Sequence, residues 1–513
     1  MQYTSTFILE AVMKKCIKLS YSKKELCTMN SNILPDKEKL WYWQEELNRV
    51  GPRFTGNKAH RKLIDFFEQE LTDMGLKVSR DKHVFTKWEA KQWSLSVQAE
   101  HGGIEEYPVT SYYPYSGTTT EDGVVGELIY CGSGPGNFKQ AAGKIAIVEV
   151  TVSKLPSSVA LRKRTSFPKS AKLPFGLRNS VVSSLMKGPD LVEAQQAGVL
   201  GVICIWKKIS AENVRGQYLP FTTGLKDCPA LWVDGNTGDQ LKQLALRHAK
   251  ARLVLHADIK GNADSDTLYA ILPGTNRSEN ILINTHTDGP NACEENGGVG
   301  LLAMAEYFSK LPLEQRQRDL VFVFVAGHFQ IPQFGIQGQA TTRWLHDHPE
   351  LWDGVGGHQK AVAGLTLEHL GCREWKDNQE NSRYSGTGNL ETELVYTANE
   401  VMNTIYLDSL KGRTKVRSIT LKPINNIHFG EGQPLFDAGI PNISLVPAPD
   451  YLCATGPNGY LDKLDIDFMD EQIASFIKMT TVIDRTPVEV LGQPEPYAKG
   501  LLGFLVKDAN EKH

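Results

Sequence analysis

The sequence predicts an α/β fold with a mainly parallel, mixed sheet covered by helices. From Tyr269 onward, apolar runs of strand length alternate with helix-like stretches. Alternation of this kind is typical of a mainly parallel sheet that is covered by helices. The chain has 513 residues, of which 41% are hydrophobic and 22% charged. That composition is ordinary for a globular protein, and the length allows two or three domains, or one domain with an insertion.

Two amphipathic helices are predicted early in the chain, between Asp36 and Gly75. They flank a Gly-Pro-Arg-Phe-Thr-Gly loop. In the second helix the apolar residues recur at helical spacing, which predicts one buried face. They are Leu63, Ile64, Phe66, Phe67 and Leu71. Strand-like segments follow near residues 93–99 and 126–131.

Residues 1–35 read as a poorly specified extension. Their short apolar patch is interrupted by Glu10 and is followed, not preceded, by lysines. A secretory signal needs the positive charge first and an unbroken apolar centre, so we expect a cytoplasmic protein. The eight cysteines show no C-x-x-C spacing and no dense framework, and we expect reduced thiols in a reducing compartment.

Charge and hydropathy argue against two classes of partner. The net charge of −3 gives no reason to expect binding to nucleic acid or to an anionic membrane. No run approaches the roughly 18 apolar residues that a membrane span requires. The oligomeric state is not determined by the sequence, and a homodimer is left open.

The region from 120 to 262 is predicted to be a compact α/β unit inserted into a host domain. Residues 143–150 and 198–206 are short buried-strand runs with a helical segment between them, and residues 228–259 read as strand, helix and strand. A polar, basic stretch over 161–180 looks like a long exposed loop. The host domain then comprises 36–119 and 263–490, and residues 491–513 form a tail.

The chemistry-bearing residues gather where the predicted strands of the host domain end. Four apolar runs cover residues 280–286, 320–327, 363–371 and 440–448. Sites in open α/β sheets form beyond the carboxyl ends of the strands. The histidines and carboxylates found there, or just before the last strand, are His286, Asp288, His328, Glu368, His369, His428 and Glu431.

Nitrogen and oxygen ligands converging from separate strands are what a zinc site requires. Two further carboxylates, Glu294 and Glu295, precede a predicted helix, and the helix dipole favours an anion such as Glu295 there. Taken one at a time, each of these residues is more often structural than functional. The prediction of a metal site therefore depends on their joint position.

This joint pattern resembles that of the co-catalytic zinc peptidases, which include bacterial aminopeptidases, glutamate carboxypeptidases and glutaminyl cyclases. The resemblance covers roughly residues 36–485. The segment "GPRFTGNKAHRKLIDFFEQELTDMGLKV" is similar to the family's lead-in helix, and "LYAILPGTNRSENILINTHTDG" to its entry into the metal site. "FDAGIPNISLV" and "LDKLD" are similar to its closing segment. The unit over 120–262 resembles the protease-associated domain that many members carry.

The resemblance implies one metal position. The family's His-x-Asp falls on His286 and Asp288, its bridging aspartate on Glu295, and its later aspartate on Glu368. His286, Glu295 and Glu368 are therefore the expected ligands. Asp288 and Glu294 are assigned to the catalytic group, together with His328.

The second metal position of the family is not reproduced. Its Glu-Glu pair, a general base followed by a ligand, falls on His328 and Phe329, and its final histidine falls on Thr455. Both exclusive ligands of that metal are missing, so we expect a remodelled centre with one Zn²⁺ or with no metal. His328 could accept a proton in place of the lost base, or could itself be a ligand beside His286.

The remaining candidate site residues are His369, His428, Glu431 and Cys453. Cys453 is one of three cysteines in loops that border the site, and a thiolate nucleophile is conceivable, although small buried cysteine is the more common case. The others are Cys293 and Cys372.

The leading hypothesis is a metal-dependent hydrolase that acts on a peptide or small amide substrate. A non-hydrolytic reaction on the same scaffold, such as cyclisation, is the first alternative. A catalytically inactive, peptidase-like binding protein is the second. Metal analysis and product identification distinguish the three.

Overall fold

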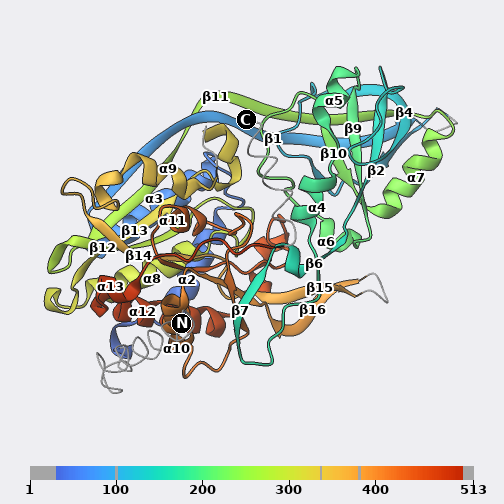
Figure 1. The fold of residues 1–513 in the computed structure, drawn as a ribbon. Helices are drawn as coiled ribbons and strands as arrows, with labels where there is room; N and C mark the ends of the chain where they lie inside the picture. The colour runs from blue at the N-terminus through green and yellow to red at the C-terminus, as the bar shows by residue number, and fades with distance from the viewer. Residues whose placement is uncertain (1–29, 99–101, 335–337, 379–382, 501–513) are drawn as a thin grey trace.

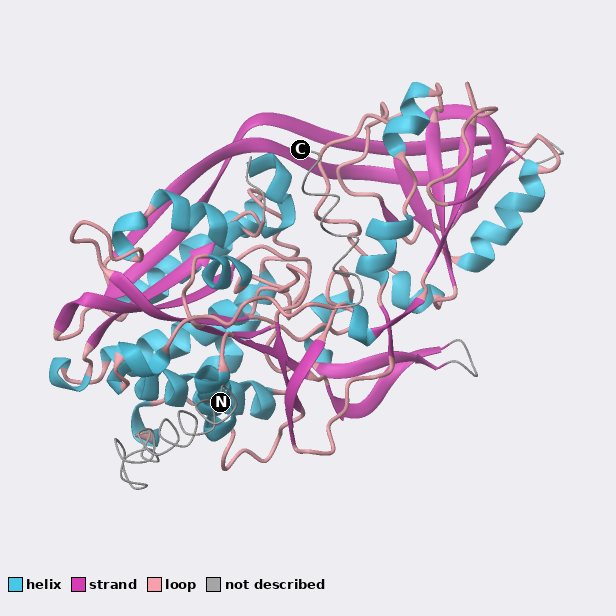
Figure 2. Cartoon of the chain, in the orientation of Figure 1, coloured by secondary structure: helices cyan, strands magenta, loops and turns pink. Residues whose placement is uncertain are grey.

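The computed structural model describes residues 30–98, 102–334, 338–378 and 383–500. The expected extension over 1–35 lies almost wholly outside these residues, and the expected tail over 491–513 lies largely outside them. Most of the described strands join one large mixed sheet that is covered by helices, as Figures 1 and 2 show. No helix within the described ranges is long and apolar enough to cross a bilayer.

Within the described residues, the large sheet contains 15 strands. They are β1 (Val78–Gln98), β2 (Ile104–Tyr107), β3 (Ser111–Tyr112), β4 (Val124–Ser133), β5 (Ile145–Thr151), β7 (Arg162–Phe167), β9 (Gly201–Lys207), β10 (Ala230–Val233), β11 (Lys250–Leu272), β12 (Asn276–His286), β13 (Arg318–Val325), β14 (Lys360–Leu367), β17 (Glu393–Thr397), β18 (Ser418–Lys422) and β19 (Asn442–Leu445). Two separate ribbons pair β6 (Lys154–Pro156) with β8 (Gly176–Arg178) and β15 (Arg373–Asn378) with β16 (Arg383–Leu390).

The α-helices include the two expected early in the chain. They are α2 (Lys37–Arg49), α3 (Lys58–Asp73), α4 (Ser180–Lys187), α5 (Leu191–Gln196), α6 (Ala211–Val214), α7 (Gly235–Ala245), α8 (Gly297–Ser309), α9 (Ala340–Asp347), α10 (Glu400–Ser409), α11 (Gln433–Asp437), α12 (Ile466–Arg485) and α13 (Val488–Leu491). The short 3-10 helices are η2 (Ser31–Ile33), η3 (Ser157–Val159), η4 (Leu313–Gln315), η5 (His328–Phe334), η6 (Pro349–Leu351) and η7 (Pro457–Lys463).

The four predicted strands β13, β12, β14 and β19 lie side by side and run parallel. Their register places His286 opposite Val325, so these strands end at the same edge of the sheet. The prediction of a mainly parallel, covered sheet is confirmed. Its consequence is that the side chains following each strand meet in one place.

Helices cover both faces of this part of the sheet. One core combines buried residues of α2, α3, α8, α10 and α12 with one face of the central strands, and a smaller core lies under α9 and α11 on the other face. The stripe predicted on α3 is buried at Leu63, Ile64, Phe67 and Leu71, whereas Phe66 is only half-buried. Burying one such side chain stabilises the fold by roughly 1.5–3 kcal/mol.

Two long antiparallel strands, β1 and β11, connect the host and inserted regions. One end of β11 pairs with β13 and the other with β4. Figure 1 shows the two strands arching from one part of the molecule to the other. Beyond them, β4, β5, β9 and β10 form a parallel sheet. The assignment of 120–262 as one inserted unit, and its kinship with protease-associated domains, stay predictions.

The expectation of a long exposed loop over 161–180 is wrong. Residues 162–167 form β7, which pairs antiparallel with β18 at the edge of the host sheet. Residues 176–178 form β8, and α4 begins at Ser180. The basic composition concealed the strand, because an edge strand keeps one side in solvent and tolerates Lys and Arg there.

Candidate metal centre

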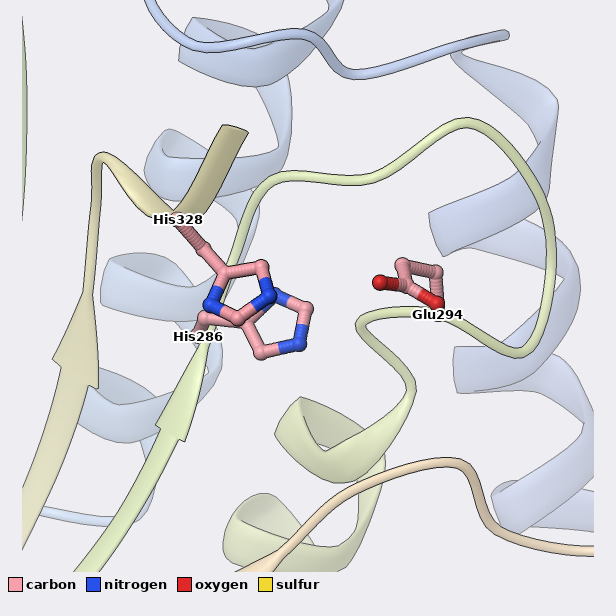
Figure 3. A group of neighbouring side chains, drawn as sticks. All are labelled: His286, Glu294 and His328. Carbon is pink, nitrogen blue, oxygen red and sulfur yellow. The ribbon is translucent and has the colours of Figure 1, made fainter. Parts of the chain in front are cut away.

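The polar residues predicted at the strand ends come together in the structure. His286 ends β12, Glu368 and His369 follow β14 directly, and His328 begins η5 just after β13. Figure 3 shows the Glu294 side chain on the loop before α8, across from His286 and His328. All five side chains are buried. Since burying unpaired polar groups is costly, each nitrogen and oxygen atom of these side chains should have a hydrogen-bond partner or a bound ion.

Each of the three histidines uses its Nδ1 atom to fix the ring. The Nδ1 of His286 lies 3.0 Å from the Asp288 carbonyl oxygen, and that of His369 lies 2.5 Å from the Pro447 carbonyl oxygen. The Nδ1 of His328 lies 2.6 Å from Glu431 Oε1. A ring nitrogen that faces a carbonyl oxygen must donate a proton, which leaves the lone pair of His286 and His369 on Nε2. This arrangement is typical of histidines that bind metals.

Three buried ligand atoms have no hydrogen-bond partner among the described residues. They are Nε2 of His286, Nε2 of His369 and Oε2 of Glu294. The last two lie 3.5 Å apart. Unpaired buried donors and acceptors are rare and indicate a missing partner. A cation that accepts electron pairs from imidazole and carboxylate would satisfy all three.

Two groups of three residues among those described have ligand atoms within 4.8 Å of one another: His286 with Glu294 and His328, and His286 with Glu368 and His369. The first group contains two stacked rings, whose centroids are 4.1 Å apart and whose planes differ by 13° (Figure 3). An imidazole lone pair lies in the ring plane, and Zn²⁺ binds about 2.0–2.1 Å from the nitrogen. Two parallel, stacked rings therefore do not point at one ion.

The second group has the better geometry for a metal. The rings of His286 and His369 are inclined by 70°, with centroids 6.1 Å apart, so their planes intersect. With Glu368 and the nearby Glu294, the group offers two nitrogen and two oxygen ligands. This donor set fits a zinc ion.

The protonation states suit the same ligand set. Burial lowers the pKa of His286 well below its usual value and that of His369 to about 3, so both rings are neutral. Burial raises the pKa of Glu294 well above its usual value, with help from Glu295, and raises that of Glu368 to about 7. Two buried carboxyl groups with raised pKa values favour a nearby cation, which would stabilise their ionised forms.

Glu295 has another partner. Its carboxylate forms a salt bridge with Arg53, and both side chains are completely buried. Arg53 also donates hydrogen bonds to the carbonyl oxygens of Gly51 and Asn291. Burial raises the pKa of Glu295 to about 7, while Arg53 opposes the rise. Glu295 is in neither ligand group, and its expected role as a ligand stays a prediction.

Arg53 is a site residue that the sequence does not identify. It lies in the Gly-Pro-Arg-Phe-Thr-Gly loop, which the sequence presents only as a connection between two helices. A single loop arginine carries no sign that its guanidinium will be buried. The only available signal is the excess of acidic residues predicted at the strand ends, which needs a compensating cation.

His328 and Glu431 form a buried pair beside the candidate metal ligands. Glu431 also accepts hydrogen bonds from the backbone N–H groups of Ala340 and Thr341 at the start of α9, at 3.2 and 2.7 Å. Burial lowers the pKa of His328, but the hydrogen bond and charge of Glu431 outweigh it, and the net pKa is raised. Conversely, the pKa of Glu431 is lowered despite burial. Both shifts favour an imidazolium paired with a carboxylate.

Asp288 holds the backbone around His328. Its carboxylate accepts hydrogen bonds from the N–H groups of His328 and Phe329, at 3.3 and 2.9 Å, and from the hydroxyl of Thr55. With both oxygens engaged, Asp288 fixes the segment that follows β13. Its predicted catalytic role stays a prediction.

The inserted region covers the centre. Phe221 stacks on His328 and on Phe329, with ring centroids 5.6 and 4.7 Å apart. Phe329 is completely buried in a hydrophobic cluster that belongs mainly to the insert, and its carbonyl oxygen accepts a hydrogen bond from Tyr115. Thr455 donates its backbone N–H to the carbonyl oxygen of Gly216 at 2.8 Å. Both residues that replace expected ligands thus contact the insert.

Two other predicted site residues lie apart from the ligand groups. His428 is buried and stacks on Tyr396, with centroids 4.2 Å apart, and its Nε2 has no partner among the described residues. Burial lowers its pKa to about 4. Burial raises the pKa of the Cys453 thiol well above its usual value, which does not favour a thiolate.

Solved structures of peptidases share this fold. An aminopeptidase from Aneurinibacillus sp. strain AM-1 matches with a TM-score of 0.55 and 18% identity, covering 90% of this chain and 97% of its own. The zinc aminopeptidase BSAP from Bacillus subtilis matches with a TM-score of 0.57 and 15% identity over 87% and 95% of the two chains. A peptidase M28 precursor from Shewanella amazonensis SB2B matches with a TM-score of 0.61 and 15% identity over 96% and 99%.

No protein-family model matches the sequence, and no curated protein sequence matches it significantly. At identities of 15–18%, the structural likeness shows the fold and nothing finer. The chain has the fold of zinc aminopeptidases over nearly its whole length.

Proposed function

We propose that this chain, which has the fold of zinc aminopeptidases, is a hydrolase of peptide or small amide substrates with a single Zn²⁺. The ligands in this proposal are His286, His369, Glu294 and Glu368. The observation that carries it is the convergence of three buried ligand atoms that lack a partner in the described part of the chain, Nε2 of His286 and His369 and Oε2 of Glu294. Such a set is costly in a protein that binds no cation.

When bound, zinc would supply Lewis-acid polarisation of the amide carbonyl group. A water molecule would add to the amide carbon and give up one proton to the Glu294 carboxylate, whose Oε2 has no hydrogen-bond partner among the described residues. As the C–N bond breaks, His328 would supply the proton that the leaving amine needs, because Glu431 holds its ring and keeps its pKa raised. Asp288 would keep His328 in place through the backbone N–H groups whose hydrogen bonds it accepts. Phe221 and Phe329 would exclude water from the imidazolium.

A second candidate is metal binding without hydrolysis. It is favoured by the closure of the centre, since His286, Glu294 and Glu368 are at most 1% exposed and Phe221 covers His328. A substrate would have to displace this cover before it reached the centre. Activity, not metal content, separates the two candidates.

The test is elemental analysis of the purified protein with two histidine variants. We expect about one zinc per chain in the wild type and in His428→Ala, and a large loss in His369→Ala. His428 is the matched control, because it is a buried histidine whose Nε2 lies outside both ligand groups. A wild type without metal, or equal loss in both variants, would contradict the ligand assignment.

Activity on a panel of peptides and amides then tests the catalytic part. His328→Ala should lower turnover by about a hundredfold or more, the usual scale for a positioned proton donor, with zinc content unchanged. Hydrolysis that is undiminished in His328→Ala would remove this residue from the mechanism. Stoichiometric zinc with no turnover on any substrate would favour the binding protein.

A further inference from the structure

Lys463, the last residue of η7, is enclosed by aromatic rings. Its Nζ lies 3.5 Å from the ring centroid of Trp375, 4.3 Å from Tyr460, 4.8 Å from Tyr384 and 5.1 Å from Tyr451. All four distances are within the roughly 6 Å range of a cation–π interaction. The residue is only 4% exposed, and none of the described carboxylates forms an ion pair with it.

The Lys463 ammonium is buried among four aromatic rings, which is an unusual environment for a lysine. A lysine is rarely buried without a carboxylate, because removing its charge from water is costly. Here burial lowers the pKa of Lys463 to about 8. The charge of Asp462 offsets part of this cost, and the rings supply cation–π contacts in addition. The rings come from the β15–β16 hairpin, the loop after β19 and η7. The lysine therefore ties together three segments that are separate in sequence.

Two of these segments hold the loop that carries Glu294. Tyr451 accepts a hydrogen bond on its carbonyl oxygen from the Asn291 side chain at 2.9 Å. The Oδ1 atom of Asn291 in turn accepts from the backbone N–H groups of Cys293 and Glu294, at 3.0 and 3.3 Å. From η7, the Gly459 carbonyl oxygen accepts the N–H of Ala292 at 2.8 Å.

The η7 turn is itself in an unfavourable backbone conformation. Asn458, Gly459 and Tyr460 have φ values of 48°, 54° and 62°, so two residues with side chains adopt the left-handed region. Such conformations persist only where the surrounding structure enforces them. Tyr460 is held by stacking against the Lys463 ammonium, and the turn presents the Gly459 carbonyl oxygen as a result.

We infer that Lys463 is a positioning residue for the candidate metal centre: its ammonium, held in the aromatic box of Trp375, Tyr384, Tyr451 and Tyr460, fixes the hydrogen bonds that orient the Asn291–Glu294 loop. The inference rests on the proposed function only in so far as Glu294 is a zinc ligand. Lys463 does not touch the reacting groups. It acts through Tyr451 and η7.

Two variants and one control test the inference. Lys463→Met removes the charge at similar length, and Lys463→Arg keeps a cation. Lys242→Met is the control for loss of a lysine elsewhere: its ammonium lies 5.7 Å from the Tyr130 ring in the insert and pairs with Glu149 and Asp239. Hydrogen exchange of the Ala292, Cys293 and Glu294 amides reports the loop directly, and chelator competition reports zinc affinity.

Lys463→Met should exchange about tenfold faster at these three amides and bind zinc about tenfold more weakly. In Lys463→Arg, the exchange rates and the zinc affinity should stay within about threefold of the wild-type values. Lys242→Met should change neither the exchange rates nor the zinc affinity. Unchanged exchange in Lys463→Met, or a change of equal size in Lys242→Met, would overturn the inference. If Lys463→Met does not fold, Tyr384→Leu removes one ring and should raise loop exchange by a smaller factor. No change there would overturn the inference.

The two proposals fail in different ways. If the wild type binds no zinc but the loop amides respond to Lys463→Met, the proposed function fails and the positioning role stands. If zinc binds normally and the exchange rates of the loop amides are the same in Lys463→Met as in the wild type, the positioning role fails and the proposed function stands.

Discussion

Glu294 and Glu295 are neighbours in the chain, yet they have different surroundings. Oε2 of both carboxylates lacks a hydrogen-bond partner among the described residues, but Oε1 of Glu295 pairs with Arg53, whereas Oε2 of Glu294 lies 3.5 Å from His369 Nε2. Successive side chains at the start of a helix point in different directions, so only one of them can face the histidines. In this structure that residue is Glu294.

The two glutamates should therefore respond differently to removal of charge. Glu294→Gln should weaken zinc binding by at least about a hundredfold, since even partners one shell removed from a metal are worth 10–100-fold. Glu295→Gln should leave Arg53 as an unpaired buried cation and lower the free energy of unfolding by about 3–5 kcal/mol. Chelator competition and urea unfolding measure the two effects. The assignment is wrong if zinc affinity falls in Glu295→Gln and not in Glu294→Gln.

At the scale of elements, η5 joins the host sheet to the insert. It follows β13 directly, and its first two residues face different ways: His328 toward Glu431, and Phe329 into the cluster with Phe221, Tyr115 and Tyr218. The rings of Tyr218 and Phe329 are 5.9 Å apart. Phe329 is therefore a packing residue, at the position where the resemblance to the co-catalytic zinc peptidases implies a metal ligand.

This packing determines what restoring the missing ligands would do. Phe329→Glu with Thr455→His should not create a second zinc site, because the carboxylate would be buried among aromatic rings of the insert. We expect the free energy of unfolding to fall by about 3–5 kcal/mol and zinc content to stay near one per chain. Phe329→Leu, which stays apolar, is the control, and its free energy of unfolding should fall by less. Two zinc ions per chain at wild-type stability would show that the insert can move away.

At the scale of the whole molecule, β1 and β11 make the host and inserted sheets continuous. β7, from within residues 120–262, adds an edge strand to the host sheet. Phe221 and Gly216, also from this region, contact Phe329 and Thr455 at the centre. The insert thus contributes to the host sheet and covers the site, in addition to forming its own sheet.

Unfolding should consequently be cooperative across both regions. Trp206 and Trp232 stack in the insert with ring centroids 4.0 Å apart, so near-UV circular dichroism is sensitive to that region. Release of zinc reports the unfolding of the candidate metal centre in the host region. We expect the two signals to change at the same urea concentration, because strands shared by both sheets cannot be lost from one alone. A separate, earlier transition of the tryptophan signal would indicate an independently unfolding insert.

Much of the fold followed from the sequence alone. The alternation of the apolar runs at 280–286, 320–327 and 363–371 with helix-like stretches predicted parallel strands, because helices connect and cover such strands. The spacing of Leu63, Ile64, Phe67 and Leu71 predicted the buried face of α3. Because parallel strands end at one edge, His286, His328 and Glu368 were expected together, and the structure places them there.

What only the tertiary structure decided is which partner each polar group meets. The sequence did not reveal that Arg53 pairs with Glu295, that Glu431 pairs with His328, or that four rings enclose Lys463. Most of these contacts join residues separated by dozens or hundreds of positions, and periodicity reports only local neighbours. Nor did it reveal β7, because an edge strand lacks the continuous apolar run that identifies a buried one. The residue types determined which chemical groups are available, and long-range packing determined which of these groups become partners.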